Sequence, residues 1–312
     1  MSSANVLFFF VIGCGPIISL SSSNWFLVWA GIEISFLGLV PLLFLGGKYM
    51  SLNKEAGLKY FCIQALGRAI LFIRGLILYF DVVDRFLFRI LFLFSLRVKL
   101  GLFPGHFWVP SIVGGLEWVP CVLMLTWQKI PPFALTVSLV SSNRYRVQEL
   151  VLILGGIRAL VGGLIGNNQT ALRPIIGASS VAHTGWASVG AVCGSLWLYF
   201  GLYCVVLLLT ASFLWEGDSL ISSIGILSLR GLPPFVIFRG KWLIIKSALR
   251  CLIRIKFLIL PILGTFLSLI FYLKFLYSFY LNSKKTSLKT RVSWMLPLAF
   301  LNLAGVGYII LL

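Results

Sequence analysis

The amino-acid sequence predicts an all-α polytopic membrane protein with about eleven transmembrane helices. Of its 312 residues, 60% are hydrophobic and only 11% are charged, and the mean hydropathy is +1.03. A soluble domain of this length needs far more polar surface. The apolar runs are long and do not alternate with polar residues, which is typical of membrane helices and not of a membrane β-barrel.

The helices are expected between polar or Gly/Pro-rich interruptions, in a single transmembrane domain that covers residues 1–312. A helix needs roughly 20 apolar residues to cross the bilayer, so each apolar run provides one crossing. The predicted segments lie near residues 4–20, 25–46, 57–80, 86–103, 116–140, 148–166, 171–191, 194–214, 219–249, 256–280 and 293–311. Residues 1–140 and 148–280 are the approximate halves of an internal repeat, and the last segment is a C-terminal helix.

The net charge of +18, from 26 Lys and Arg against 8 Asp and Glu, would suggest a nucleic-acid partner in a soluble protein. Here many of the cations lie inside apolar runs, and no basic patch alternates with exposed aromatic residues, so we exclude nucleic-acid binding. The 6 cysteines are scattered, without a CxxC pair or a Cys/His cluster. We therefore expect no metal site and no iron–sulfur centre in this chain.

Two predicted helices are interrupted by glycine and proline. The first carries KLGLFPG at residues 99–105, and the second carries RGLPP at residues 230–234. Proline removes a helix donor and glycine relaxes the backbone, so both segments are expected to be broken helices. Lys99 precedes the first break, whereas Lys241 follows the second. This opposite order favours an antiporter-like inverted repeat.

Four ionisable residues lie near the centres of their own apolar segments, namely Glu33, Lys99, Lys129 and Lys241. Each costs about 2.5–3.5 kcal/mol to insert into hydrocarbon, so each is a functional candidate. A carboxyl group and three amino groups at such positions favour a proton relay, because buried lysines can exchange protons near neutral pH. The alternatives are a neutral Glu33 bonded to a backbone carbonyl, and lysines that reach the membrane surface along their aliphatic chains.

The chain has 2 histidines. His183 lies in SSVAHTGW at residues 179–186 and is a further candidate for the relay, because histidine exchanges protons at physiological pH. A structural role is the open alternative for His183. His106 directly follows the first break, where a structural role is expected.

A set of stretches spread along the whole chain forms a recognisable pattern: WAGIE at 29–33, EAGLKYF at 55–61, KLGLFPGHFWVP at 99–110, TWQK at 126–129, NQT at 168–170, SSVAHTGW at 179–186 and LRGLPPFVIFRGKW at 229–242. Together these stretches resemble the NADH dehydrogenase subunit 2 family, whose members are antiporter-like membrane subunits of respiratory complex I. The short animal form of this family lacks three N-terminal helices, in agreement with a count of about eleven.

The resemblance implies a proton-translocating core subunit in the mitochondrial inner membrane, in contact with other membrane-arm subunits of complex I and with lipid, cardiolipin among the candidates. It makes Glu33 the helix glutamate beside Lys99, with Lys99 and Lys241 as the broken-helix lysines and Lys129 as the central one. We therefore expect Glu33 within pairing reach of Lys99. The NADH, FMN, iron–sulfur clusters and ubiquinone used by such a complex would not be bound by this chain, and electron transfer in another arm would drive it.

Two other functions share many of these features. A subunit of a cation/proton antiporter would have the same fold and the same lysines. A structural membrane scaffold would use the buried charges only to hold helices together. The family stretches favour complex I over the antiporter. A Lys129→Met variant distinguishes the scaffold from the other two functions, because a scaffold with this substitution would keep full pumping once assembled.

Four arginines lie inside apolar segments, at positions where the family usually carries Ser, Gly or Ala: Arg68, Arg74, Arg158 and Arg230. No acidic residue nearby in sequence is an obvious partner, and four unpaired guanidinium groups would cost on the order of 10 kcal/mol. Several animal mitochondrial codes read AGA and AGG as Ser or Gly. We hypothesise that some of these positions are not arginine in the living protein. The alternative is true arginines that reach carbonyls or lipid phosphates.

Overall fold

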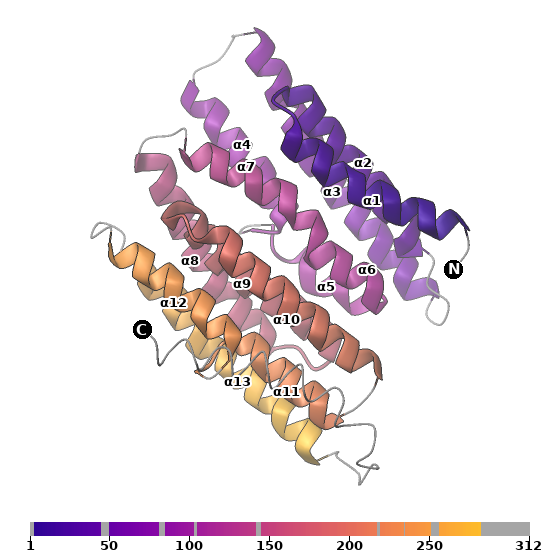
Figure 1. Cartoon of the computed structure of the whole chain (residues 1–312), viewed down its shortest axis with the longest axis vertical. Helices are drawn as coiled ribbons and strands as arrows, with labels where there is room; N and C mark the ends of the chain where they lie inside the picture. The colour runs from indigo at the N-terminus through magenta and orange to yellow at the C-terminus, as the bar shows by residue number, and fades with distance from the viewer. Residues whose placement is uncertain are drawn as a thin grey trace. The chain divides into compact units, whose positions relative to one another are not determined.

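A computed structural model of the chain describes residues 3–44, 50–80, 85–102, 105–141, 145–216, 219–233, 235–250 and 256–281. The elements assigned in these ranges are all helices, which confirms the predicted all-α class (Figure 1). They are α1 (Ser3–Ser21), α2 (Trp25–Phe44), α3 (Met50–Phe80), α4 (Arg85–Leu100), α5 (Trp108–Gly115), α6 (Trp118–Leu125), the 3₁₀ turn η1 (Trp127–Lys129), α7 (Ile130–Ser141), α8 (Tyr145–Asn167), α9 (Leu172–Cys193), α10 (Leu196–Glu216), α11 (Ser219–Arg230), α12 (Val236–Leu249) and α13 (Ile259–Leu281). The predicted helix at 293–311 lies outside the described residues.

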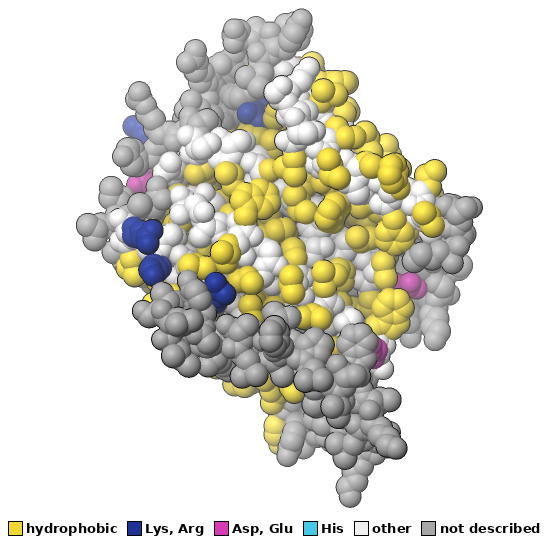
Figure 2. Space-filling view, viewed as in Figure 1, with side chains coloured by type: hydrophobic (Ala, Val, Ile, Leu, Met, Phe, Trp, Pro, Cys, Tyr) yellow, Lys and Arg dark blue, Asp and Glu magenta, His cyan; other side chains and the backbone are white. Residues whose placement is uncertain are grey.

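Within the described ranges, 5 helices are long and apolar enough to cross a membrane. These spans are Trp25–Phe44, Ser51–Ile77, Arg146–Asn167, Leu196–Glu216 and Lys256–Ser278. Figure 2 shows hydrophobic side chains over most of the described surface on the face in view, with charged side chains towards the margins. The membrane class is therefore supported, and the full count of about eleven crossings stays a prediction.

The chain divides into two compact units. The first consists of Met1–Val147 and Thr170–Val181, and the second of Gln148–Gln169 and Ala182–Leu312. Each unit contains one of the two predicted breaks, between α4 and α5 in the first and between α11 and α12 in the second. An inverted-repeat relation between the breaks stays a prediction.

Helices α1 and α2 of the first unit approach each other closely at two glycines. A Cβ added to Gly15 would lie 2.6 Å from the carbonyl oxygen of Gly31, and one added to Gly31 would lie 2.7 Å from that of Gly15. Side chains this small let membrane helices pack backbone against backbone, where van der Waals contact replaces the missing hydrophobic driving force. This close packing fixes the position of α2, which carries Glu33, against α1.

Both predicted helix breaks are present, and each begins at a left-handed glycine. Gly101 has φ 66° and Gly231 has φ 67°, directly after the last residues of α4 and α11. At the first break the Gly101 N–H donates to the Val98 carbonyl at 3.2 Å and the Leu102 N–H to the Arg97 carbonyl at 2.7 Å. This Schellman pattern satisfies two of the carbonyls that the end of α4 leaves open.

A third interruption lies at Lys129, inside the predicted segment 116–140, where Pro131 and Pro132 predict a kink just after the lysine. The structure has a sharper break than a kink, because α6 ends at Leu125 and the 3₁₀ turn η1 separates it from α7. Pro131 and Pro132 lack the N–H groups that would donate to the carbonyls of Trp127 and Gln128 in a regular helix. The Ile130 N–H instead bonds the Trp127 carbonyl. The same region holds α5, which the prediction left between two segments.

We expect Gly101→Ala to lower the free energy of unfolding by at least about 1–2 kcal/mol, the cost of left-handed backbone for a residue with a side chain. An alanine Cβ there would also lie 2.7 Å from Cγ2 of Val109. Thermal unfolding followed by tryptophan fluorescence measures the change. Gly201→Ala on α10 is the control, because nothing lies within 4 Å of a Cβ added at that position. Equal unfolding midpoints for the two variants would contradict the assigned break.

Candidate functional site

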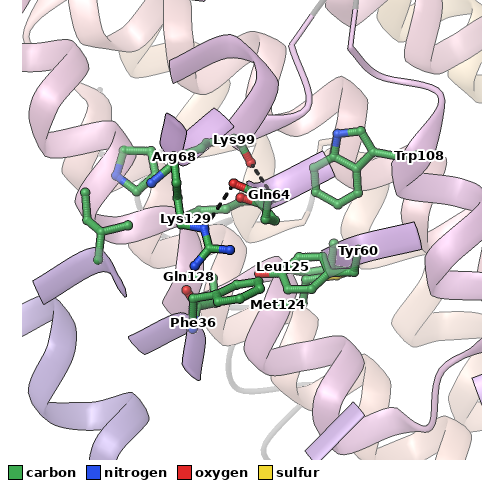
Figure 3. A pocket seen from close by; sticks show the side chains of 12 residues that line it. Phe36, Tyr60, Gln64, Arg68, Lys99, Trp108, Met124, Leu125, Gln128 and Lys129 are labelled. Carbon is green, nitrogen blue, oxygen red and sulfur yellow. Dashed lines mark hydrogen bonds between the residues drawn. The ribbon is translucent and has the colours of Figure 1, made fainter. Parts of the chain in front are cut away.

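A small cavity of about 20 Å³ in the first unit brings two predicted relay lysines together. Lys99 from α4 and Lys129 from η1 both line it, with Gln64, Arg68 and Gln128 beside them (Figure 3). The lysines are buried, with 6% and 4% of their surfaces exposed. A polar cavity of this size has room for about one water molecule. The site therefore places two amino groups around a space that suits proton exchange.

Glu33 forms its ion pair with Arg68 and not with Lys99. Nη1 of Arg68 donates to Oε1 of Glu33, and 27% of the Glu33 side chain stays exposed. Arg68 is held further by its Nε, which donates to the Gln64 carbonyl at 3.2 Å, and by the Phe36 ring, 3.7 Å from its guanidinium carbon. Among the described residues no direct ion pair joins Glu33 to Lys99, and the expectation that the two lie within pairing reach stays a prediction. The guanidinium group of Arg68 reaches from α3 to one oxygen of the Glu33 carboxylate.

Lys99 is the penultimate residue of α4, two residues before the break at Gly101. Its backbone carbonyl accepts a hydrogen bond from Nε2 of Gln64 at 3.3 Å, while its Nζ has no hydrogen-bond partner among the described residues. A buried amino group without such a partner is costly to keep charged. The Gln64 contact satisfies the helix end and leaves the amino group at the cavity.

The turn that carries Lys129 is fastened to α1 and α2 by its two preceding side chains. Nε1 of Trp127 donates to the Ile12 carbonyl at 2.9 Å. Gln128 and Ser35 exchange two hydrogen bonds, from Gln128 Nε2 to the Ser35 carbonyl at 2.9 Å and from Ser35 Oγ to Gln128 Oε1 at 3.3 Å. Short 3₁₀ segments inside a helix often mark functional positions, and this one sets the place of Lys129.

In the second unit, Lys241 binds the end of the broken helix. Its Nζ donates to the Arg230 carbonyl, the last of α11, at 2.7 Å. A cation at a helix C-terminus also interacts favourably with the helix dipole. The two breaks therefore end in different ways, with a neutral amide from Gln64 at the first and the amino group of Lys241 at the second.

His183 lies in the same part of the second unit as Lys241. Its Nδ1 is 2.8 Å from the hydroxyl of Tyr199 on α10, and its ring centroid is 4.9 Å from that of Tyr203. His183 and Lys241 both line a small cavity with Trp186 and Arg230. His106, by contrast, is buried beside the first break, and its carbonyl accepts the Val109 N–H at 3.3 Å.

The predicted residues thus fall into two groups. Glu33, Lys99 and Lys129 belong to the first unit, and His183 and Lys241 to the second. The sequence analysis did not identify the polar residues that position Lys99 and Lys129. Two of these, Gln64 and Gln128, could have been found from their spacing. Gln64 lies four residues before Arg68 on one helix face, and Gln128 directly precedes Lys129.

The structure bears differently on the hypothesis of miscoded arginines at each position, because the surroundings of these side chains differ. Arg68 has an acidic partner in Glu33, 35 residues away in the sequence, and a carbonyl acceptor in Gln64. At Arg74 the guanidinium carbon lies 3.0 Å from the Phe92 ring centroid, closer than the ~3.5–4.0 Å at which carbon atoms attract best. Arg158 is completely buried. The hypothesis is opposed at position 68 and stays a prediction at the others.

Peptide mass spectrometry across residues 60–80 tests the assignment at position 68 directly. The ion pair with Glu33 predicts tryptic cleavage after this residue and an arginine mass. A serine or glycine mass at position 68 would contradict the pair and leave Glu33 to another cation. A small residue at position 74 would relieve the crowding against Phe92 and support miscoding there.

Comparison with known proteins agrees with this architecture. Residues 22–215 match the family described as NADH:quinone oxidoreductase/Mrp antiporter, TM. The chain is 33% identical over 289 residues to NADH-ubiquinone oxidoreductase chain 2 of Albinaria caerulea, covering 93% of this chain and 93% of that protein. Its fold is similar to a chain of respiratory complex I from Thermus thermophilus, with a TM-score of 0.80 at 21% identity, over 98% of this chain and 78% of that one.

A second solved structure shares the fold. A chain of the Mrp complex from Dietzia sp. is similar with a TM-score of 0.75 at 17% identity, over 86% of this chain and 59% of the other. The likeness to both assemblies concerns the fold, whereas the family match and the animal relative concern the sequence itself. The chain therefore belongs to the NADH:quinone oxidoreductase/Mrp antiporter family, among the relatives named NADH-ubiquinone oxidoreductase chain 2, as its sequence predicted.

Proposed function

We propose that this chain is a proton-translocating core membrane subunit of NADH:ubiquinone oxidoreductase, respiratory complex I. Glu33, Lys99 and Lys129 act in the first unit, and Lys241 with His183 in the second. The observation that carries the proposal is the cavity that Lys99 and Lys129 share, because each of the two lysines lies at an interruption of a helix. Broken helices that bring charged groups together in a membrane are typical of ion-translocating proteins.

The relay works through changes of charge at these groups. A proton added to or removed from one buried amino group changes the electrostatic energy of the next, since charges interact strongly where water is scarce. The Glu33–Arg68 pair supplies a fixed local field beside Lys99, and the Lys241 bond to the Arg230 carbonyl responds to movement at the second break. Electron transfer in another arm of the complex drives these changes, and this chain binds no redox cofactor itself.

The proposal includes location and partners. The relative from Albinaria caerulea is named as a chain of NADH-ubiquinone oxidoreductase, an animal respiratory enzyme of mitochondria. We therefore place this chain in the mitochondrial inner membrane as a multi-pass subunit. Its neighbours are other membrane-arm subunits of complex I and lipid, including cardiolipin. Exposed apolar residues on described helices, such as Phe10, Phe26 and Phe266, fit such a surrounding.

Native gel electrophoresis of the source membranes tests the assembly. We expect this chain, identified by peptide mass, to migrate with an assembly that oxidises NADH in the gel. The physical reason is that contacts with neighbouring subunits bury part of the exposed apolar surface of this chain, so that it stays within the assembly. Migration of the chain at its own mass, or in an assembly without NADH oxidation, would contradict the proposal and favour the antiporter.

The antiporter alternative has one specific observation behind it, the shared fold with a chain of the Mrp complex. Proteoliposomes distinguish the two functions. A complex I subunit moves protons only while NADH is oxidised, whereas an antiporter exchanges protons for another cation when a cation gradient is applied without NADH.

A further inference from the structure

Tyr199 of α10 lies between two of the groups assigned to the relay in the second unit. Its hydroxyl is 2.8 Å from Nδ1 of His183 on α9. Its ring packs on the backbone of α12, since a Cβ added to Gly240 would lie 2.8 Å from Cδ2 of Tyr199. Gly240 directly precedes Lys241, so one tyrosine contacts the histidine at one end and the lysine-bearing turn at the other.

The surroundings of this tyrosine hold it in one place. Tyr199 is 1% exposed and His183 is 4% exposed. The His183 ring is enclosed further by Tyr203, with ring centroids 4.9 Å apart. A buried phenol hydroxyl needs a hydrogen-bond partner, and a buried imidazole needs one to settle which nitrogen carries its proton.

We propose that Tyr199 is a positioning residue of the second unit, which orients the His183 ring and links it to the turn of α12 that carries Lys241. This inference rests on the proposed proton-translocating function. The hydroxyl forms a hydrogen bond with Nδ1 of His183. Because Gly240 has no side chain, the tyrosine ring packs directly against the backbone of α12. A shift of the Lys241 turn therefore moves the hydrogen-bond partner of His183.

A second contact supports the same link between α9 and α12. Trp186 lies three residues after His183 on one face of α9, and its ring centroid is 5.9 Å from Nζ of Lys241. Both α9 residues line the small cavity that Lys241 also lines. Among the described residues, the titratable and charged groups that face His183 or its direct neighbours are Tyr199 and Tyr203 on α10, Arg158 on α8, Arg230 on α11, Lys241 on α12 and Tyr272 on α13.

The test compares Tyr199→Phe with Tyr203→Phe in the assembled complex, reconstituted into liposomes. Each change removes one buried hydroxyl from α10 and keeps the aromatic ring. NADH-driven proton uptake is measured from about pH 6 to pH 9. We expect Tyr199→Phe to lower the rate about tenfold and to displace the pH profile, while Tyr203→Phe keeps the wild-type profile. An unchanged profile in Tyr199→Phe, or an equal displacement in both variants, overturns the inference, even if thermal stability changes.

A double substitution shows whether Tyr199 acts through His183. In a His183→Ala background, Tyr199→Phe is expected to cause no further loss, because the group it positions is gone. An additional loss of the full tenfold size overturns the inference. Lys241→Met in the same assay separates this question from the proposed function. If Lys241→Met pumps normally the proposed function fails, whereas if it stops pumping and Tyr199→Phe behaves as wild type only the role of Tyr199 fails.

Discussion

Replacing Lys129 with methionine is expected to lower proton translocation by about a hundredfold, the size of effect that a positioned proton-transfer group contributes. Lys129 is 4% exposed on η1 and lines the cavity with Lys99. Methionine fills a similar volume but carries no exchangeable proton. Because a buried charge is removed without leaving a large void, the complex is expected to assemble and remain as stable as the wild type.

Two measurements belong to this prediction. Native gels report the amount of assembled complex, and a pH-sensitive dye in proteoliposomes reports NADH-driven pumping. Lys59→Met is the control, because it makes the same substitution at an exposed lysine. The Lys59 side chain is 47% exposed, and among the described residues its ion pair is with Glu55, one helical turn away. A Lys129→Met complex that assembles and pumps at the wild-type rate would favour the structural scaffold over the relay.

Removing either partner of the Glu33–Arg68 pair is expected to cost about 2–3 kcal/mol of stability. Loss of one partner of a fully buried pair typically costs about 3–5 kcal/mol, and the partial exposure of Glu33 reduces that value. Glu33→Gln leaves the guanidinium group facing a neutral amide, and Arg68→Met leaves a carboxylate in an apolar unit. Both variants should also change pumping, because the fixed field beside Lys99 changes.

The double variant Glu33→Gln/Arg68→Met separates pairing from packing. It is expected to be more stable than either single variant, because no unpaired charge remains. Thermal unfolding of the detergent-solubilised complex measures all three. The matched control is the exposed pair of Glu55 and Lys59, which lies on α3 as Arg68 does. Substituting either of these two residues should change the stability little. Additive losses for Glu33 and Arg68 would mean that the two side chains do not interact.

The helix breaks at Gly101 and Gly231 could be predicted because their cause is local. Glycine and proline act on their own backbone and on the preceding turn, whichever helices lie nearby. The same reasoning was incomplete at Lys129. Pro131 and Pro132 predict a kink just after Lys129, whereas the loss of their N–H donors to the carbonyls of Trp127 and Gln128 goes with a separate 3₁₀ turn.

The buried positions of Lys99, Lys129 and Lys241 were also predictable, since a charge at the centre of a long apolar segment has no route to water except through the protein. Their partners were not. Arg68 pairs with Glu33 across 35 residues, and Gln128 bonds Ser35 across 93. A sequence shows which residues share one helix face, but it does not show which face of another helix that one will meet.

By itself, the sequence determined the membrane class, the helical secondary structure, the two Gly/Pro breaks and the ionisable residues on which the proposed function depends. These properties follow from composition and from local backbone chemistry, which act over a few residues. The tertiary structure decided that Arg68 holds Glu33, that η1 fastens Lys129 to α1 and α2, and that Tyr199 joins His183 to the Lys241 turn. The physical reason is that polar side chains buried in an apolar unit must find partners in space, and helix packing alone determines which ones are within reach.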